Sequence, residues 1–172
     1  MKKINFGQFS SFQLLTLLAV LLFLASCGSR RHTAYSTTRA AKAAEAMADI
    51  KSKSMYRFIT DWAGVKYKLG GLDKRGIDCS GFAFLLNKEI YGINIPRRSR
   101  DQAAMVRSKN PGKLEEGDLV FFSFGGREVD HVGVYLNNGY FVHASTTRGV
   151  IVEDLNIPAY QRVLVKAGQP KK

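Results

Sequence analysis

The sequence predicts an α+β fold, in which N-terminal helices pack on a small antiparallel β-sheet. Strong helix formers with apolar residues three and four positions apart occupy the chain from about Ala40 to Ala63. Short apolar segments separated by glycine, asparagine or proline dominate the later part. Helices followed by strands are typical of α+β domains. A chain of 172 residues that is 45% hydrophobic has room for one modest core, so we expect one domain.

The first 26 residues have the organisation of a signal peptide. Two lysines precede an apolar run over residues 14–24. As a helix this run would rise about 16 Å, which is too short for the ~30 Å core of a bilayer. The sequence Leu24-Ala25-Ser26-Cys27 that follows resembles the lipobox of bacterial lipoproteins. We therefore expect residues 1–26 to be removed and Cys27 to be lipidated. A buried apolar helix, or an ordinary signal peptide with an incidental cysteine, is the alternative.

The expected domain organisation follows from this start. Residues 27–50 would form the lipid-anchored N-terminus and a tether, flexible over 28–40 where serine, threonine, arginine and glycine are frequent. Residues 51–172 would form the functional domain. The formal net charge of +12 favours anionic envelope polymers or phospholipid surfaces as partners. Nucleic acid is not expected, because the sequence has neither zinc-finger spacing nor an aromatic RNA-binding signature. We expect a monomer in the bacterial cell envelope, anchored to the outer membrane and facing the periplasm.

The helices and strands can be placed from their patterns. One or two helices are expected from Ala40 to Ala63, with a break near Ser52 to Ser54. A loop should follow over 67–71, and a further helix should run through Phe82 to Ile90 and stop near Gly92. The expected strands are Asp118–Phe122, Val132–Leu136, Tyr140–Ser145, Val150–Val152 and Arg162–Val165.

Cys79 is the first candidate for chemistry. Lipidation of Cys27 would leave it without an intramolecular disulfide partner, although the usual role of a free cysteine is that of a small buried apolar side chain. Asp78 can cap the helix that follows. The helix N-terminus would then lower the thiol pKa from its ordinary value of about 8.5 and could hold an oxyanion through its N–H groups.

A base for this thiol must come from His32, His131 or His143, and His32 lies in the tether. His131 and His143 flank a hairpin whose turn is Asn137-Asn138-Gly139. We expect His131 to take the thiol proton and His143 to orient its ring, as the third member of a triad does. Zinc binding by Cys79 and the two histidines is an alternative. No Cys-x-x-Cys or His-Glu-x-x-His spacing accompanies them, so we expect neither metal nor cofactor.

The strand register decides whether the two histidines can cooperate. A two-residue turn would pair Asn137 with Tyr140 and place the histidines on opposite faces. A three-residue turn with a left-handed Gly139 would pair Leu136 with Tyr140, leaving the histidines as diagonal neighbours about 7 to 8 Å apart. Only this second register yields one continuous apolar face, so we predict the three-residue turn.

Several motifs together resemble the NlpC/P60 family of bacterial cell-wall cysteine peptidases, over about Tyr56 to Val165. Each motif is weak alone, but their order and spacing are specific. They are Trp62-Ala63-Gly64, Tyr67-Lys68-Leu69-Gly70-Gly71, Asp78-Cys79-Ser80-Gly81-Phe82, Ile95-Pro96-Arg97, Gly117-Asp118-Leu119-Val120-Phe121-Phe122, His131-Val132-Gly133-Val134-Tyr135 and Tyr140-Phe141-Val142-His143-Ala144-Ser145.

The resemblance implies a papain-like, circularly permuted fold, with Cys79 as nucleophile, His131 as base and His143 as the polar third residue. It also suggests that the Tyr67 hydroxyl binds substrate or stabilises the oxyanion. Asp78 and Ser80, which flank the nucleophile, are expected to contribute to substrate binding or to the oxyanion site.

The activity that the resemblance implies is hydrolysis of peptide-stem bonds in peptidoglycan through an acyl-enzyme. The bond is either D-γ-glutamyl to a diamino acid or the D-Ala to diaminopimelate cross-link, and the sequence does not choose between them. Two alternatives stay open: a non-catalytic peptidoglycan-binding lipoprotein, and an acyltransferase or amidase on the same scaffold. Asp130 could raise the pKa of the His131 imidazole, and Arg97 or Arg98 could contact substrate carboxylates, but a solvated surface position is the simpler expectation for each.

Overall fold

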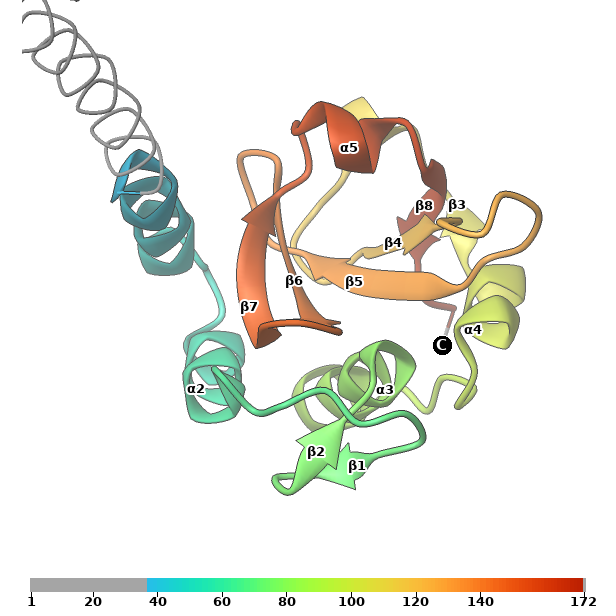
Figure 1. The fold of residues 1–172 in the computed structure, drawn as a ribbon, viewed down its shortest axis with the longest axis horizontal. Coiled ribbons are helices and arrows are strands. Elements are labelled where there is room, and N and C mark those ends of the chain that lie inside the picture. The colour runs from blue at the N-terminus through green and yellow to red at the C-terminus, as the bar shows by residue number, and fades with distance from the viewer. Residues whose placement is uncertain (1–36, 172) are drawn as a thin grey trace, which may run out of the picture. The chain divides into compact units, whose positions relative to one another are not determined.

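The computed structural model describes residues 37–171 (Figure 1). The expected signal peptide, Cys27 and His32 therefore lie outside the described residues. Contacts divide the chain into Met1–Lys42 and Ala43–Lys172, and all elements discussed below as parts of the site belong to the second unit. Within the described range, no helix combines the length and the apolar character that a membrane crossing requires.

Two helical segments come first along the described chain. Residues 37–48 are helical, and α2 (Lys53–Trp62) follows after a break. Ser52 caps α2 by accepting a hydrogen bond from the Met55 N–H, so the break covers residues 49–52 and ends where the predicted one begins. Residues 37–40, which we assigned to a flexible tether, are helical instead. The alanine-rich sequence over residues 40–48 explains the difference, because alanine has the highest helix propensity and the helix that it forms extends back over residues 37–39. Ala46 and Ile50 are already buried in the domain.

The helix that carries Cys79 is α3 (Cys79–Tyr91). Asp78 is its N-cap, and its side chain accepts a hydrogen bond from the Gly81 N–H. The helix ends at Gly92, whose left-handed conformation (φ 66°) a residue with a side chain would rarely adopt. Both ends therefore confirm what the sequence predicts.

A six-stranded sheet follows, and every pair of neighbouring strands in it is antiparallel. The strand order is β3-β8-β4-β5-β6-β7, which places the last strand of the chain inside the sheet. This confirms the α+β class. The strands are β3 (Arg107–Ser108), β4 (Leu119–Phe122), β5 (His131–Tyr135), β6 (Tyr140–Ser145), β7 (Gly149–Asp154) and β8 (Leu164–Gln169).

The remaining elements are short, and the sequence patterns did not predict them. Each has two to seven residues, too few to show a hydrophobic period. They are β1 (Leu72–Asp73), β2 (Gly76–Ile77), α4 (Ser99–Met105), the 3-10 turn η1 (Pro111–Lys113) and α5 (Pro158–Gln161).

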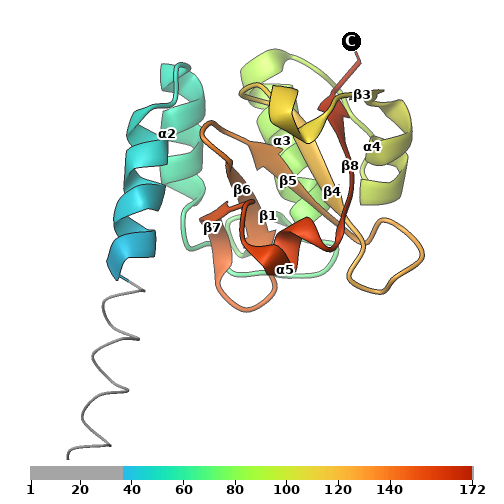
Figure 2. The same cartoon turned by 90° about the horizontal axis from the view of Figure 1, so that it is seen from above.

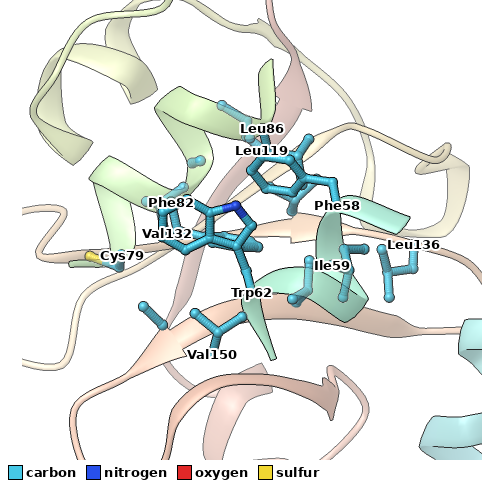
Figure 3. Close-up of a cluster of buried hydrophobic side chains, with 14 of the residues drawn as sticks. Phe58, Ile59, Trp62, Cys79, Phe82, Leu86, Leu119, Val132, Leu136 and Val150 are labelled. Atoms are coloured by element: carbon cyan, nitrogen blue, oxygen red, sulfur yellow. The ribbon is translucent and has the colours of Figure 1, made fainter. Parts of the chain in front are cut away.

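The two faces of the sheet are covered by different helices. α3 lies on one face and α5 on the other (Figure 1), and α2 lies beside α3 at the β7 end of the sheet (Figure 2). The larger core fills the first face, where Phe58, Trp62 and Phe82 pack against strand residues such as Val132 and Val150 (Figure 3). A smaller cluster containing Val120, Phe122 and Phe141 fills the second face. Cys79 lies at the edge of the larger core. His131 and His143 lie on the second face, against Phe122 and Phe141 of the smaller cluster.

Candidate active site

Cys79 is the first residue of α3, and only 5% of it is exposed. Figure 3 shows its sulfur at the edge of the apolar cluster. The backbone N–H groups of Val132, Ser80 and Cys79 itself are placed to hydrogen-bond the sulfur. Val132 directly follows His131 in β5, so the thiol lies against the start of the strand that carries the candidate base.

The electrostatic state of the thiol differs from our expectation. Burial raises the pKa of Cys79 to about 11, and the three backbone N–H groups, which favour the thiolate, only partly offset it. The nearby Asp78 carboxylate raises this pKa further. A helix N-terminus does face the sulfur, as predicted, but desolvation of the charged form is the larger effect. At neutral pH the thiol is therefore protonated.

The hairpin has the predicted register. Val134 pairs with Val142 and Tyr135 with Phe141, as the three-residue alternative requires. Val132, Val134 and Val142 belong to the helix-side core, and Phe141 belongs to the other face.

The turn itself is built differently from the expected one. Asn138 and Gly139 are both left-handed (φ 48° and 81°), and the Tyr140 N–H donates to the Asn137 carbonyl. Leu136, rather than Asn137, donates its N–H to the Tyr140 carbonyl. Asn137 is thus an extra residue in its strand. A turn with two left-handed residues suits the twist of a hairpin, and the bulge restores the register that buries the apolar face.

The register brings the two predicted histidines into contact. Nε2 of His131 lies 2.7 Å from Nδ1 of His143, and the two rings are nearly perpendicular. Both are buried, with 8% and 3% exposed. Because Nε2 of His131 faces His143, its Nδ1 is the ring nitrogen left to exchange a proton with the thiol.

Burial also decides the charge of His131. Desolvation, followed by the neighbouring His143, lowers the pKa of His131 to about 3. Asp130 acts in the raising direction that we considered, but its effect is smaller. The resting pair is therefore a thiol and a neutral imidazole, which can accept the thiol proton during attack.

Asp78 and Ser80 belong to a hydrogen-bond network centred on Arg97. The Arg97 guanidinium donates to both Asp78 carboxylate oxygens at 2.8 and 2.9 Å, to the Ser80 hydroxyl at 3.0 Å and to the Gly71 carbonyl at 2.9 Å. Asp78 also accepts the N–H of Gly70 at 2.8 Å. Burial raises the pKa of Asp78, but these donors outweigh it and keep the pKa below its ordinary value. Arg97 is thus an internal clamp on the start of α3, and our expectation of a solvated position was wrong.

Tyr67 lies in the loop before β1, where it forms an isolated bridge with Ile77. Burial raises the pKa of its hydroxyl, and the Cys79 and Asp78 charges raise it further. A charge interaction of this kind requires proximity. The hydroxyl therefore lies near Cys79, and its role in substrate binding or at the oxyanion stays a prediction.

Glu153 is a site residue that sequence reasoning missed. Its Oε2 lies 3.4 Å from Nε2 of His143, on the side away from His131. We expected the strand to end at Val152, so Glu153 was not considered part of the sheet. An acidic residue directly after Val150-Ile151-Val152 was the available signal, because a charge that continues a buried strand needs a partner.

The aromatic residues around the histidines shape one wall of the site. Phe124, which is 55% exposed, meets the His131 ring edge-on with centroids 5.8 Å apart. The Asp130 carboxylate holds this loop by accepting the N–H groups of Phe124 and Gly125. Among residues 37–171, no group of three or more His, Cys, Asp or Glu side chains is arranged to hold a metal ion.

A buried thiol at a helix N-terminus, against the start of a strand whose histidine contacts a second imidazole, is arranged for thiol-dependent acyl transfer. The comparisons with known proteins agree with this class. The chain belongs to the NlpC/P60 family, whose model matches residues 64–169.

Two relatives and one solved structure illustrate the similarity. Over 116 residues the chain is 45% identical to the murein DD-endopeptidase MepS/murein LD-carboxypeptidase of Escherichia coli K12, covering 66% of this chain and 60% of that protein. A probable endopeptidase of Haemophilus influenzae is 33% identical over 142 residues, covering 82% and 87%. An NlpC/P60 family structure from Bacillus cereus superposes with a TM-score of 0.63 at 31% identity, covering 67% of this chain and 39% of that one. The match thus spans about three fifths of the length of the E. coli relative.

Proposed function

We propose that the protein is a cysteine peptidase that hydrolyses peptide-stem bonds of peptidoglycan. The observation that carries the proposal is the contact between His131 and His143 beside a buried, uncrosslinked Cys79 at a helix N-terminus. A wall-binding module would need a groove but not a nucleophile, a base and an orienting group together. The names of the relatives supply the substrate class.

In the proposed reaction, Cys79 Sγ attacks the carbonyl carbon of the scissile bond while its proton passes to Nδ1 of His131. The carbonyl oxygen becomes an oxyanion, for which the N–H groups at the start of α3 and the Tyr67 hydroxyl are the nearby donors. His131 then returns the proton to the leaving amine as the C–N bond breaks. Water, deprotonated by His131, attacks the thioester, and the released thiolate takes the proton back. Each step balances without a metal or cofactor.

The neutral resting pair has a consequence for this reaction. With the pKa of the thiol at about 11 and that of His131 at about 3, a thiolate–imidazolium ion pair is not the stable state of the two groups. Proton transfer must then accompany attack on the carbonyl, when the N–H donors stabilise the new oxyanion. The charge stabilisation would thus come from the oxyanion donors as the carbonyl is attacked.

Of the two candidate bonds, the D-Ala to diaminopimelate cross-link is the one we propose. The support is the printed name of the E. coli relative, a murein DD-endopeptidase, together with 45% identity over 116 residues. Asp78 and Ser80 are engaged with Arg97. We therefore assign Asp78 to holding the helix N-terminus, and Ser80 to the oxyanion site through its backbone N–H.

We further propose that the protein is a lipoprotein of the cell envelope, anchored through Cys27 after removal of residues 1–26. The support is the Leu24-Ala25-Ser26-Cys27 sequence after a short apolar run. Labelling with a palmitate analogue should modify the full chain but not a Cys27→Ala variant. Labelling of both forms would contradict the assignment.

Digestion of purified peptidoglycan tests the activity. The soluble form lacking residues 1–27 is incubated with peptidoglycan, and the released fragments are identified by mass spectrometry. New amino and carboxyl termini at the cross-link would support the proposal. Cleavage at the γ-glutamyl bond would reassign the bond, and transfer of the acyl group to another amine would favour an acyltransferase. Co-sedimentation with the wall without new termini would favour the binding module.

A further inference from the structure

Glu153 is an acidic residue of β7 on the same face of the sheet as the two histidines, and only 3% of it is exposed. It pairs with Phe141 across the β6–β7 ladder, while His143 pairs with Ile151. Glu153 is therefore a diagonal neighbour of His143 on the same face of the sheet. A carboxylate that is buried in this way is costly unless other groups compensate its charge.

Three groups surround the Glu153 carboxylate. Nε2 of His143 lies 3.4 Å from Oε2, the Tyr160 hydroxyl of α5 donates to the same oxygen, and the Arg148 guanidinium donates to Oε1. Burial alone would raise the pKa of Glu153, but these partners outweigh it and hold the pKa at about 2. The group behind His143 is therefore a carboxylate throughout the neutral range, and it can only accept hydrogen bonds.

This acceptor imposes an order on the ring nitrogens. A neutral histidine has one N–H. Nε2 of His143 is buried and forms no hydrogen bond, but the negative charge of the carboxylate 3.4 Å away favours placing the N–H on this nitrogen, which leaves Nδ1 as an acceptor. That nitrogen lies 2.7 Å from Nε2 of His131, which must then carry the N–H of its own ring. The lone pair of His131 is left on Nδ1, the nitrogen that takes the proton from Cys79.

We propose that Glu153 is a positioning residue of the active site, which fixes the tautomer of His143 and, through it, the tautomer of His131. The inference rests on the proposed thiol peptidase function, and it adds Glu153 to the proposed set of Cys79, His131 and His143. Glu153 itself exchanges no proton. Its charge also stabilises the imidazolium that forms at His131, because Glu153 acts on His131 in the direction that favours the charged ring.

The charged and titratable groups that face Glu153 come from several elements. They are His143 on β6, Arg148 in the turn before β7, Tyr160 on α5 and, at longer range, His131 on β5. Arg148 is 55% exposed, so its charge is screened by water more than those of the buried members. The effect of removing Glu153 on the proposed set should therefore come mainly through His143.

The first test measures the tautomers directly, without any substrate. In the soluble form labelled with ¹⁵N-histidine, ring nitrogen shifts should show His143 and His131 both protonated on Nε2 at neutral pH. In Glu153→Gln, a population of His143 protonated on Nδ1 should appear, because the amide can donate to Nε2 as well as accept. A wild-type His143 protonated on Nδ1 would overturn the proposal, whatever the variants do.

The second test measures catalysis against a matched control. Glu153→Gln should lower kcat by about tenfold to a hundredfold with little change in KM, because the ring order matters in the transition state and not in binding. Asp154→Asn removes the same charge from the next residue of β7, whose carboxylate caps the Asn156 N–H outside the site. This control should keep kcat within about twofold. Equal kcat in Glu153→Gln and wild type would overturn the inference.

Alkylation of Cys79 by iodoacetamide separates this inference from the proposed function. Its rate at neutral pH should fall in Glu153→Gln and not in Asp154→Asn, because the thiol relies on His131 for proton removal. If wild-type protein leaves peptidoglycan intact, the proposed substrate is wrong, but the tautomers and the alkylation rates still decide the role of Glu153. Unchanged tautomers and unchanged alkylation would reduce Glu153 to a structural link between β7 and α5.

Discussion

The helix side and the sheet side of the site are held by different forces. Around Cys79, the start of α3 is fixed by charge-assisted hydrogen bonds among Asp78, Arg97 and backbone groups. Around His143, the ring centroids of Phe141 and Tyr160 lie 4.9 and 6.1 Å from that of the imidazole, and the Glu153 carboxylate lies next to its Nε2. The proposed nucleophile is thus placed through its backbone and the proposed base through side-chain packing. Substitutions on the two sides should therefore fail in different ways.

The largest effect should come from the base itself. His131→Ala leaves the thiol beside its backbone donors but without a proton acceptor, so kcat/KM for stem-peptide cleavage should fall by about 10³-fold or more. The thermal midpoint should fall as well, because the buried ring packs against Phe122 and Phe124 and is the partner of His143 Nδ1, so activities are compared at equal folded concentration. Activity within tenfold of wild type would mean that another group serves as the base.

On the helix side, Arg97→Ala should act mainly on stability. It leaves the Asp78 carboxylate, which is 5% exposed, without its cation. Removing one partner of a fully buried pair costs about 3–5 kcal/mol, and we expect about 2 kcal/mol here because Arg97 is partly exposed. Urea unfolding of Arg97→Ala and of Arg100→Ala provides the comparison.

Arg100 is the matched control because its ion pair with Glu128 is exposed on both sides. Loss of such a pair should cost no more than about 0.5 kcal/mol. Equal destabilisation by the two alanine variants would show that the clamp at the start of α3 contributes no more than an ordinary surface pair.

On the sheet side, Gly133→Ala should disturb packing. An added Cβ would lie 2.5 Å from Cδ2 of Phe141, which is fully buried and packs against His143. Overpacking of this kind costs about 1–3 kcal/mol, and the shifted ring should also lower activity. Gly112→Ala, whose Cβ would meet its nearest neighbour at 3.5 Å, should change neither quantity appreciably. An active, equally stable Gly133→Ala would show that the Phe141 ring can shift without disturbing His143.

The last prediction concerns the pH dependence of stability on both sides of the site. Because the pKa of His131 falls from 6.5 to about 3 on folding, the unfolded chain binds a proton first, and stability should decline as pH falls from 6.5 towards 3. Because the pKa of Cys79 rises from 9 to about 11, stability should also decline as pH rises from 9 towards 11. Urea midpoints of wild type, His131→Gln and Cys79→Ala across pH measure both slopes. Unchanged slopes in the variants would contradict the assigned charges.

Local patterns predicted much of this molecule. Asp78 as a cap and Gly92 as a stop bounded α3, and the demand for one apolar face selected the hairpin register that joins His131 to His143. These features depend on neighbours in the sequence, which a pattern can show. The left-handed Asn138 and the bulge at Asn137 were missed because two turns could satisfy the same register.

What the sequence could not show depends on residues that meet only after folding. Arg97 lies 19 residues from Asp78, in a segment without a hydrophobic period. Glu153 meets partners from β6, α5 and the preceding turn. The raised pKa of the Cys79 thiol was missed for the same reason: a motif reports a helix N-terminus but not how completely the sulfur is buried.

Digestion of peptidoglycan by wild-type protein and Cys79→Ala, both lacking residues 1–27 and compared at equal folded concentration, tests the central claim most directly. We predict new stem-peptide termini with wild-type protein only, since a methyl side chain cannot form the thioester. New termini at comparable rates from both proteins would show that Cys79 is not the nucleophile and would contradict the mechanism.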